Sequence, residues 1–255
     1  MNIYKSGCSY QSIIRIPTPA PSVSGGTGRG RLDTRSVAGI AVFSSLAIIL
    51  AAVSQALGLN FPVIPYLQFD VGEVAIVLAF FIFGPVPALL SSVVEFAGLL
   101  VFGQQVPIGP LLKLFALVST LAGLWAGSRL VSGSGRLGLA RLVGSGGLAG
   151  AFVRAAVMTV PNYYLIVFLY SVAGIEGFLK GPFALVGIGL TDSNALALIL
   201  AFTAVFNVLQ MVFVMTVSYF VLRVPMVSQV KVGGRVPWFA LVLGGKGNSA
   251  NEPVS

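Results

Sequence analysis

The chain has 255 residues, of which 56% are hydrophobic and only 9% are charged, whereas a soluble domain typically carries about 25% charged residues. This composition excludes a water-soluble globular protein and predicts a polytopic membrane protein. The single cysteine, Cys8, excludes a disulfide framework, the absence of histidine excludes Ser-His-Asp and Cys-His catalysis, and the net charge of +8 lies on the flanks of apolar segments rather than on a nucleic-acid-binding face.

Residues 1–36 are rich in proline, glycine and arginine and lack the apolar core of a signal peptide, so they are predicted to form a disordered cytoplasmic tail. A membrane-crossing helix needs about 20 apolar residues. Six segments qualify, with ragged ends: 37–57, 72–84, 86–103, 109–130, 147–174 and 193–222. The sequence therefore predicts an all-α bundle of six transmembrane helices over residues 37–222.

The short second segment and the C-terminal residues each call for a separate prediction. The second segment, 72–84, is short, so it must borrow from its flanks or be shielded by its neighbours. Residues 223–255 are predicted to form a second cytoplasmic tail, with a short interfacial piece around Trp238 and Phe239.

The distribution of arginine predicts the orientation of the six helices. Six crossings place both basic termini on one side, together with the loop that carries Arg129, Arg136 and Arg141. The loops 58–71, 104–108 and 175–192 fall on the other side, and they contain Lys180 but no arginine. The positive-inside rule then places both termini in the cytoplasm. The three outer loops mix apolar residues with glycine and proline, and they either form a lid over a pocket or pack on helix ends; residues 182–190 could be re-entrant.

A few ionisable and amide side chains lie in or beside the apolar segments, where such groups usually mark a functional path. They are Glu73, Glu95, Lys113, Arg154, Asn162, Asn207 and Gln210. Lys113 is within reach of Asp70, Glu73 or Glu95 if the bundle closes that way, and a structural ion pair is expected. Arg154 lies near the inner end of the fifth segment and is expected to snorkel to the lipid headgroups.

The amides fall into two groups. Asn162 follows a helix-kinking Pro161 and precedes Tyr163, which places an amide beside aromatic rings; the alternative is a hydrogen bond between helices. Asn207 and Gln210 are three residues apart and so share one helical face. Their donors and acceptors suit a planar ligand with a polar edge.

The first segment has small residues at intervals of four, Ala41 with Ser45 and Ala47 with Ala51. This spacing lets two helices approach closely, either within the bundle or against a partner.

The order of several motifs resembles the S components of energy-coupling factor (ECF) vitamin transporters, above all the riboflavin-binding type. The motifs are a loop with Pro62 and Pro65, the element Asp70-Val71-Gly72-Glu73, the helix end Phe83-Gly84-Pro85, Glu95, Asn162-Tyr163 and Phe206-Asn207. The resemblance covers about residues 37–222, and it is the combination and order of the motifs that is specific.

The resemblance implies a six-helix subunit in a prokaryotic cell membrane that binds a vitamin, in the first place riboflavin, from outside. It also implies partners, namely a transmembrane coupling subunit and a pair of ATPases, and no catalysis by this chain and no cofactor of its own. The substrate would contact Tyr66, Leu67, Asp70, Glu95, Asn162, Tyr163, Asn207 and Gln210. The coupling subunit would dock on Ala41 and Ser45, where the family has an Ala-xxx-Ala face.

One departure from the family leaves the vitamin open. Riboflavin binders often have a lysine three residues after the asparagine of helix six, and this chain has Gln210. Another vitamin or vitamin-like compound is therefore an alternative substrate. Two further hypotheses are a membrane enzyme with Asp70, Glu73 and Glu95 as acid–base groups, and a stand-alone secondary transporter. ATP hydrolysis by this chain is excluded, because Gly244-Gly245-Lys246 lacks the spacing of a phosphate-binding loop.

Overall fold

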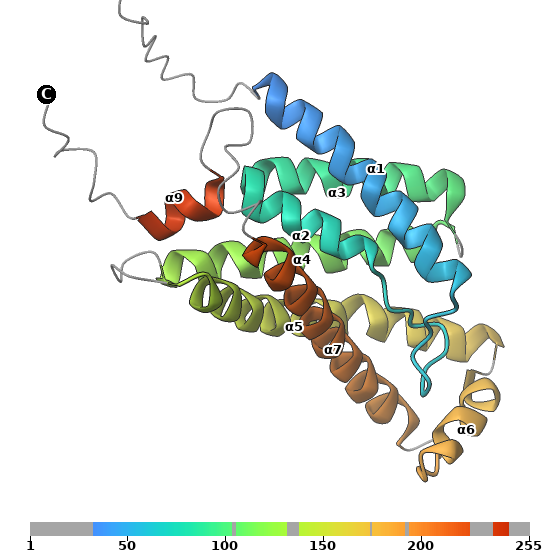
Figure 1. Ribbon diagram of the computed structural model, residues 1–255. Coiled ribbons are helices and arrows are strands. Elements are labelled where there is room, and N and C mark those ends of the chain that lie inside the picture. The colour runs from blue at the N-terminus through green and yellow to red at the C-terminus, as the bar shows by residue number, and fades with distance from the viewer. Residues whose placement is uncertain are drawn as a thin grey trace, which may run out of the picture. The chain divides into compact units, whose positions relative to one another are not determined.

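The computed structural model describes residues 33–103, 106–131, 138–173, 175–191, 194–224 and 237–244. The described residues form helices, and the only strand-like pairing among them is an isolated bridge between Asn60 and Gln68. The helices are α1 (Thr34–Ala56), α2 (Gly72–Phe83), α3 (Pro85–Phe102), α4 (Ile108–Val131), α5 (Leu139–Ala173), α6 (Ile175–Leu185), α7 (Ala195–Arg223) and α9 (Trp238–Gly244), and Figure 1 shows how they are arranged. The all-α prediction is thus confirmed for these residues.

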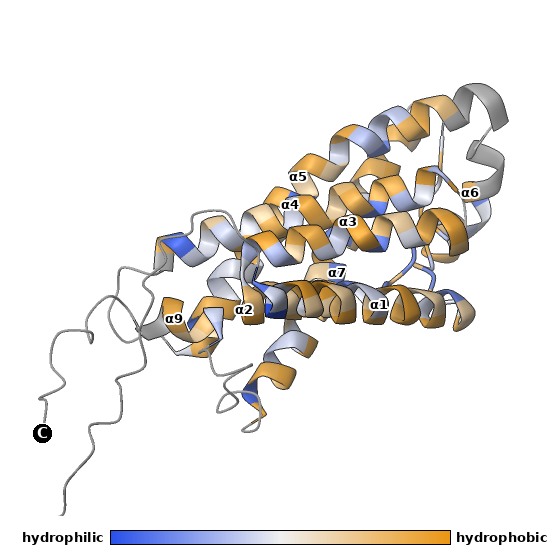
Figure 2. Ribbon diagram, turned by 90° about the horizontal axis from the view of Figure 1, so that it is seen from above, coloured by the Kyte–Doolittle hydropathy of each residue, from blue (hydrophilic) through white to orange (hydrophobic). Residues whose placement is uncertain are grey.

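Five of these helices, α1, α3, α4, α5 and α7, are long and apolar enough to cross a membrane. In α1, only 22% of the most apolar stretch of 18 residues is buried, and the share is the same in α5. Most side chains of these two helices therefore face away from the bundle. Figure 2 shows the hydrophobic colour along the sides of the helices. An apolar exterior of this extent fits lipid rather than water, which confirms the prediction of a multi-pass membrane protein.

The short helix α2 lies inside the bundle. It has 12 residues and so spans only about 18 Å, less than the roughly 30 Å of a bilayer core. Every residue from Gly72 to Phe81 is buried, because α1, α3, α4, α7 and α9 all pack against the helix. This confirms the expectation that the second segment is shielded by its neighbours.

The turn between α2 and α3 follows from its sequence, Phe83-Gly84-Pro85. Gly84 has a φ of 98°, a conformation that a side chain would strain. Pro85 then occupies the first position of α3, where its missing N–H costs no helical hydrogen bond. The two helices are therefore joined with no intervening loop beyond Gly84.

The helix α9, which lies where the short piece around Trp238 and Phe239 was predicted, packs over this turn. The ring of Trp238 lies 4.9 Å from that of Phe80, centroid to centroid, and Phe239 is buried in the core. A Cβ atom on Gly84 would come within 3.1 Å of the Trp238 indole. An apolar run of seven residues too short to cross a membrane can still be buried when it finds a partner surface, and α2 provides one here.

Glycines bring α4 and α5 together. A Cβ atom on Gly123 would lie 2.5 Å from the Cα of Gly150, and one on Gly127 would lie 2.8 Å from the Cα of Gly146. This close approach explains why α5 begins at Leu139 rather than at the predicted residue 147. The glycine-rich stretch before residue 150 looks too weakly apolar for a membrane helix, yet it forms the interface with α4.

The outer loop predicted over residues 175–192 contains a helix, α6. Its Leu179 and Phe183 are buried in one cluster with Phe61, Val63 and Ile64 of the segment between α1 and α2. Helix α6 and this segment thus cover the same end of the bundle. The residues that follow α6 form a turn and irregular chain up to Thr191.

Candidate functional site

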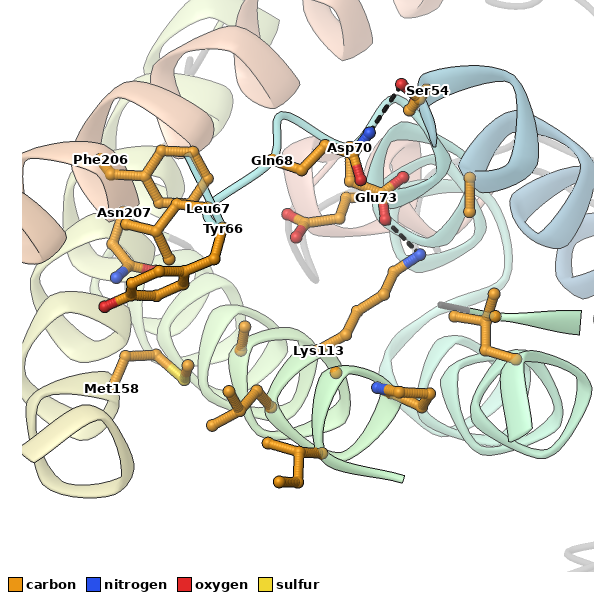
Figure 3. Close-up of a pocket in the computed structure, with 18 of the residues that line it drawn as sticks. Ser54, Tyr66, Leu67, Gln68, Asp70, Glu73, Lys113, Met158, Phe206 and Asn207 are labelled. Atoms are coloured by element: carbon orange, nitrogen blue, oxygen red, sulfur yellow. Dashed lines mark hydrogen bonds and ion pairs between the residues drawn. The ribbon is translucent and has the colours of Figure 1, made fainter. Parts of the chain in front are cut away.

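A cavity of about 790 Å³ lies at the end of the bundle covered by the segment between α1 and α2. Its walls come from the C-terminal half of α1, the start of α2, the ends of α3 and α4 that face this segment, and the middle of both α5 and α7. On one side Tyr66, Leu67, Met158, Phe206 and Asn207 gather, as Figure 3 shows. The cavity has the size and the mixed lining of a small-molecule site.

The segment 59–70, which we call the roof loop, covers this cavity. Two backbone hydrogen bonds close it into a hairpin-like turn, from Phe61 N to Leu67 O (2.7 Å) and from Phe69 N to Leu59 O (2.8 Å). The apolar side chains of Phe61 and Ile64 are buried against α6 and α7. The apolar composition of the loop therefore serves packing, and it leaves Tyr66 at the cavity.

Polar contacts fix both the roof loop and the start of α2. Ser54 of α1 accepts hydrogen bonds from Gln68 Nε2 at its carbonyl (2.8 Å) and from Val71 N at its hydroxyl (2.9 Å). Gln210 of α7 donates to the carbonyl of Asp70 (2.8 Å) and accepts from the N–H of Asp70 (3.4 Å). The loop is thus held by polar contacts from α1 and from α7.

Lys113 of α4 joins the roof loop to α3. Its ammonium group forms ion pairs with Asp70 and, at 2.5 Å, with Glu95. Asp70 and Lys113 reach the cavity, with side chains 17% and 13% exposed, whereas Glu95 is fully buried behind Lys113. Figure 3 shows Lys113 extended toward Asp70. The predicted ion pair of Lys113 with a nearby acid is confirmed.

Arg154 does not snorkel to the headgroups, and that prediction is wrong. Its side chain is 3% exposed and binds Glu73 through two nitrogens, at 2.5 and 2.9 Å. Its Nε also donates to Asn207 Oδ1 (2.9 Å), and its Nη1 to the Thr120 hydroxyl (3.3 Å). Because α5 begins eight residues earlier than predicted, Arg154 lies well inside the helix and faces α2, α4 and α7.

The predicted substrate-binding residues divide into two groups. Tyr66, Leu67, Asp70, Asn162 and Asn207 line the cavity. The other three do not: Glu95 and Gln210 are fully buried behind its wall, and Tyr163 is 42% exposed and stacks edge-on against Tyr164. Asn162 donates to the Met158 carbonyl of its own helix (2.6 Å).

Several cavity residues escaped the sequence analysis. Met158 and Leu165 line the wall from α5, yet apolar residues in an apolar helix carry no pattern that would single them out. Arg154 was named in the sequence analysis, but only as a contact of the lipid headgroups. The signal for its buried position was the set of three acids, Asp70, Glu73 and Glu95, which Lys113 alone cannot neutralise.

The two pairs of small residues on α1 have different surroundings. Ala47 and Ala51 are buried, and a Cβ atom on Gly72 would come within 2.5 Å of the Ala47 carbonyl oxygen. They serve the packing of α1 on α2. Ala41 and Ser45 are exposed on the surface of α1.

Comparisons with known proteins bear on the fold. No protein-family model and no curated protein matches this sequence. A solved structure, described as "Structure and mechanism of the S component of a bacterial ECF transporter", has a similar fold with a TM-score of 0.55. The two sequences are 20% identical, and the match covers 74% of this chain and 94% of the solved one. The arrangement of helices in this chain is thus similar to that of an ECF transporter S component.

Proposed function

We propose that this chain is the substrate-binding membrane subunit of an ATP-driven ECF vitamin importer and that its ligand is riboflavin. The observation that carries the proposal is the cavity beneath the roof loop, in a bundle whose fold is similar to an S component. A cavity closed by an anchored loop suits tight binding, because little chain must be ordered when the ligand enters.

The lining fits a planar ring with a polar edge. Tyr66, Leu67 and Phe206 offer apolar and aromatic surface for the faces of the ring, and Asn162 and Asn207 offer amide groups for its edge. Gln210 is turned toward the backbone of Asp70. The replacement of the lysine of riboflavin binders by Gln210 therefore affects how the roof loop is anchored, and not the lining of the cavity.

The proposal includes the orientation and the partners. With six crossings and both termini in the cytoplasm, the roof loop lies on the outer side of a prokaryotic cell membrane, where it would meet the vitamin first. A separate transmembrane coupling subunit would dock on α1 and transmit the work of two ATPases. A membrane enzyme is less well supported, because Asp70, Glu73 and Glu95 are each held in an ion pair rather than free for proton transfer.

Titration of riboflavin into the detergent-purified chain tests the proposal. We expect quenching of flavin fluorescence that saturates at one flavin per chain, because the ring would lie against Tyr66 and Phe206. A heat-unfolded sample of the same chain is the control. A folded sample that causes no quenching would contradict riboflavin as the ligand, and the same titration with other vitamins would then follow.

Ala41→Trp is expected to spare riboflavin binding and to block assembly with the coupling subunit. Ala41 is exposed on α1, at the far end of that helix from the cavity, so a large ring there cannot reach the ligand. Co-purification with a tagged coupling subunit measures assembly. Leu46→Trp is the matched control, since Leu46 is also exposed on α1 but lies about 140° around the helix from Ala41. Normal co-purification of Ala41→Trp would contradict this docking face.

A further inference from the structure

We propose that the cavity selects an uncharged or cationic ligand and rejects anionic ones, so that it discriminates a vitamin from its own phosphate ester. The inference rests on the proposed binding function and adds to it the charge class of the substrate. It follows from how the charged groups at the cavity are paired.

The charges at the cavity do not leave a positive excess. Among the described residues, the charged ones that line it are Asp70, Glu73, Lys113 and Arg154, and Glu95 contacts Lys113 from behind. Three carboxylates thus face two cations. An anion entering this site would meet no unneutralised positive charge and would add repulsion at short range.

Arg154 cannot serve as an anion receptor without giving up its present partners. A guanidinium group binds phosphate through two parallel N–H donors. Both terminal nitrogens of Arg154 already hold the two carboxylate oxygens of Glu73, and its Nε holds Asn207. A phosphate would have to displace Glu73 and leave that carboxylate buried without a cation, which is unfavourable.

Lys113 is shared between two carboxylates in the same way. Its ammonium group lies between Asp70 on the roof loop and Glu95 on α3. A phosphate that approached it from the cavity would also approach the carboxylate of Asp70, which is partly exposed there. The lysine therefore serves to hold the roof loop to α3 rather than to receive a negative ligand.

The helix starts near the cavity do not change this balance. At the start of α2, the N–H groups of Val71 and Gly72 donate to Ser54 and to the side chain of Asp70. At the start of α4, Pro110 has no N–H, and the N–H of Leu111 donates to the Pro107 carbonyl. The N–H groups of Val71, Gly72 and Leu111 are therefore already paired and not available to bind a phosphate.

The test compares riboflavin with riboflavin 5′-phosphate in the fluorescence titration. For the unaltered chain we expect the phosphate ester to bind at least tenfold more weakly. Asp70→Asn should reduce that ratio at least tenfold, because it removes the carboxylate that faces the cavity and leaves Lys113 paired with Glu95 alone, while the amide oxygen can still accept from Gly72 N. Asp33→Asn removes the same charge from the far end of α1 and should leave the ratio unchanged. Glu95→Gln is a second route to the same effect if Asp70→Asn folds poorly.

The outcomes separate this inference from the proposed function. Equal or tighter binding of the phosphate ester by the unaltered chain would overturn the inference and leave the proposed function intact. If neither flavin binds a folded sample, riboflavin is not the ligand, and thermal shifts with thiamine and thiamine monophosphate decide the charge class instead. A shift with thiamine alone supports the inference, whereas equal shifts, or no shift with either compound, overturn it.

Discussion

Arg154→Met is expected to lower the free energy of unfolding by about 3–5 kcal/mol, the cost of leaving one partner of a buried ion pair alone. The substitution keeps an unbranched side chain of similar reach but removes both bonds to Glu73 and the bond to Asn207. The buried carboxylate of Glu73 would then lose the cation that it is paired with. The midpoint of thermal unfolding in detergent, followed by circular dichroism, measures the effect.

Two controls isolate the ion pair from the loss of an arginine. Arg141→Met makes the same change at an exposed position of the same helix, and it should leave the midpoint nearly unchanged. The double variant Glu73→Leu with Arg154→Met removes both charges, and it should recover much of the lost stability. If Arg154→Met melts like Arg141→Met, the buried pair does not hold α2, α5 and α7 together.

Asn207→Ala is expected to weaken riboflavin binding by at least tenfold. Asn207 lines the cavity, and its two hydrogen bonds, with Arg154 and with the Thr203 carbonyl, use one acceptor lone pair and one of its two donors. The remaining donor and lone pair can reach a ligand edge. Truncation to alanine removes this donor and this lone pair, which weakens binding directly. It also removes one hydrogen-bond partner of Arg154, which disturbs the cavity wall and weakens binding indirectly. Fluorescence titration gives the dissociation constants.

Two further variants of α7 sharpen this experiment. Thr203→Val removes a buried hydroxyl that makes no hydrogen bond, one turn away and outside the lining, so binding should be unaffected. Asn207→Asp keeps an oxygen acceptor for Arg154 but loses the amide donors to the Thr203 carbonyl and to the ligand, so it should still bind weakly. Near-unchanged affinity of Asn207→Ala would contradict the assignment of Asn207 to the ligand.

Much of the fold could be predicted from the sequence, because length and apolarity are properties of each segment by itself. The turn at Gly84 could also be predicted, because glycine tolerates a positive φ and the proline that follows it suits the first position of a helix. The burial of the short piece at Trp238 could not be predicted, because it depends on Phe80 of α2, far away in the sequence. The six-crossing count and the orientation stay predictions, supported by the distribution of arginine.

The candidate site was predictable only to the level of helix faces. Asn207 and Gln210 share a face, as their spacing requires, but one lines the cavity and the other binds the backbone of Asp70. The spacing of two residues along a helix shows that they share a face, but it does not show which of the two side chains reaches a cavity. The burial of Arg154 was not predicted, because the start of α5 was placed eight residues too late and Arg154 then lay near the end of the predicted helix.

The position of Ser54 on α1 has a consequence for the kinetics of ligand exchange. Ser54 holds Gln68 and Val71, while Ser45 lies on the exposed side of the same continuous helix, about 14 Å away along its axis. A tilt of α1 would therefore displace the anchor of the roof loop relative to its other anchors on α4 and α7. A protein bound to the exposed side of α1 could shorten the lifetime of the occupied cavity without contacting the ligand.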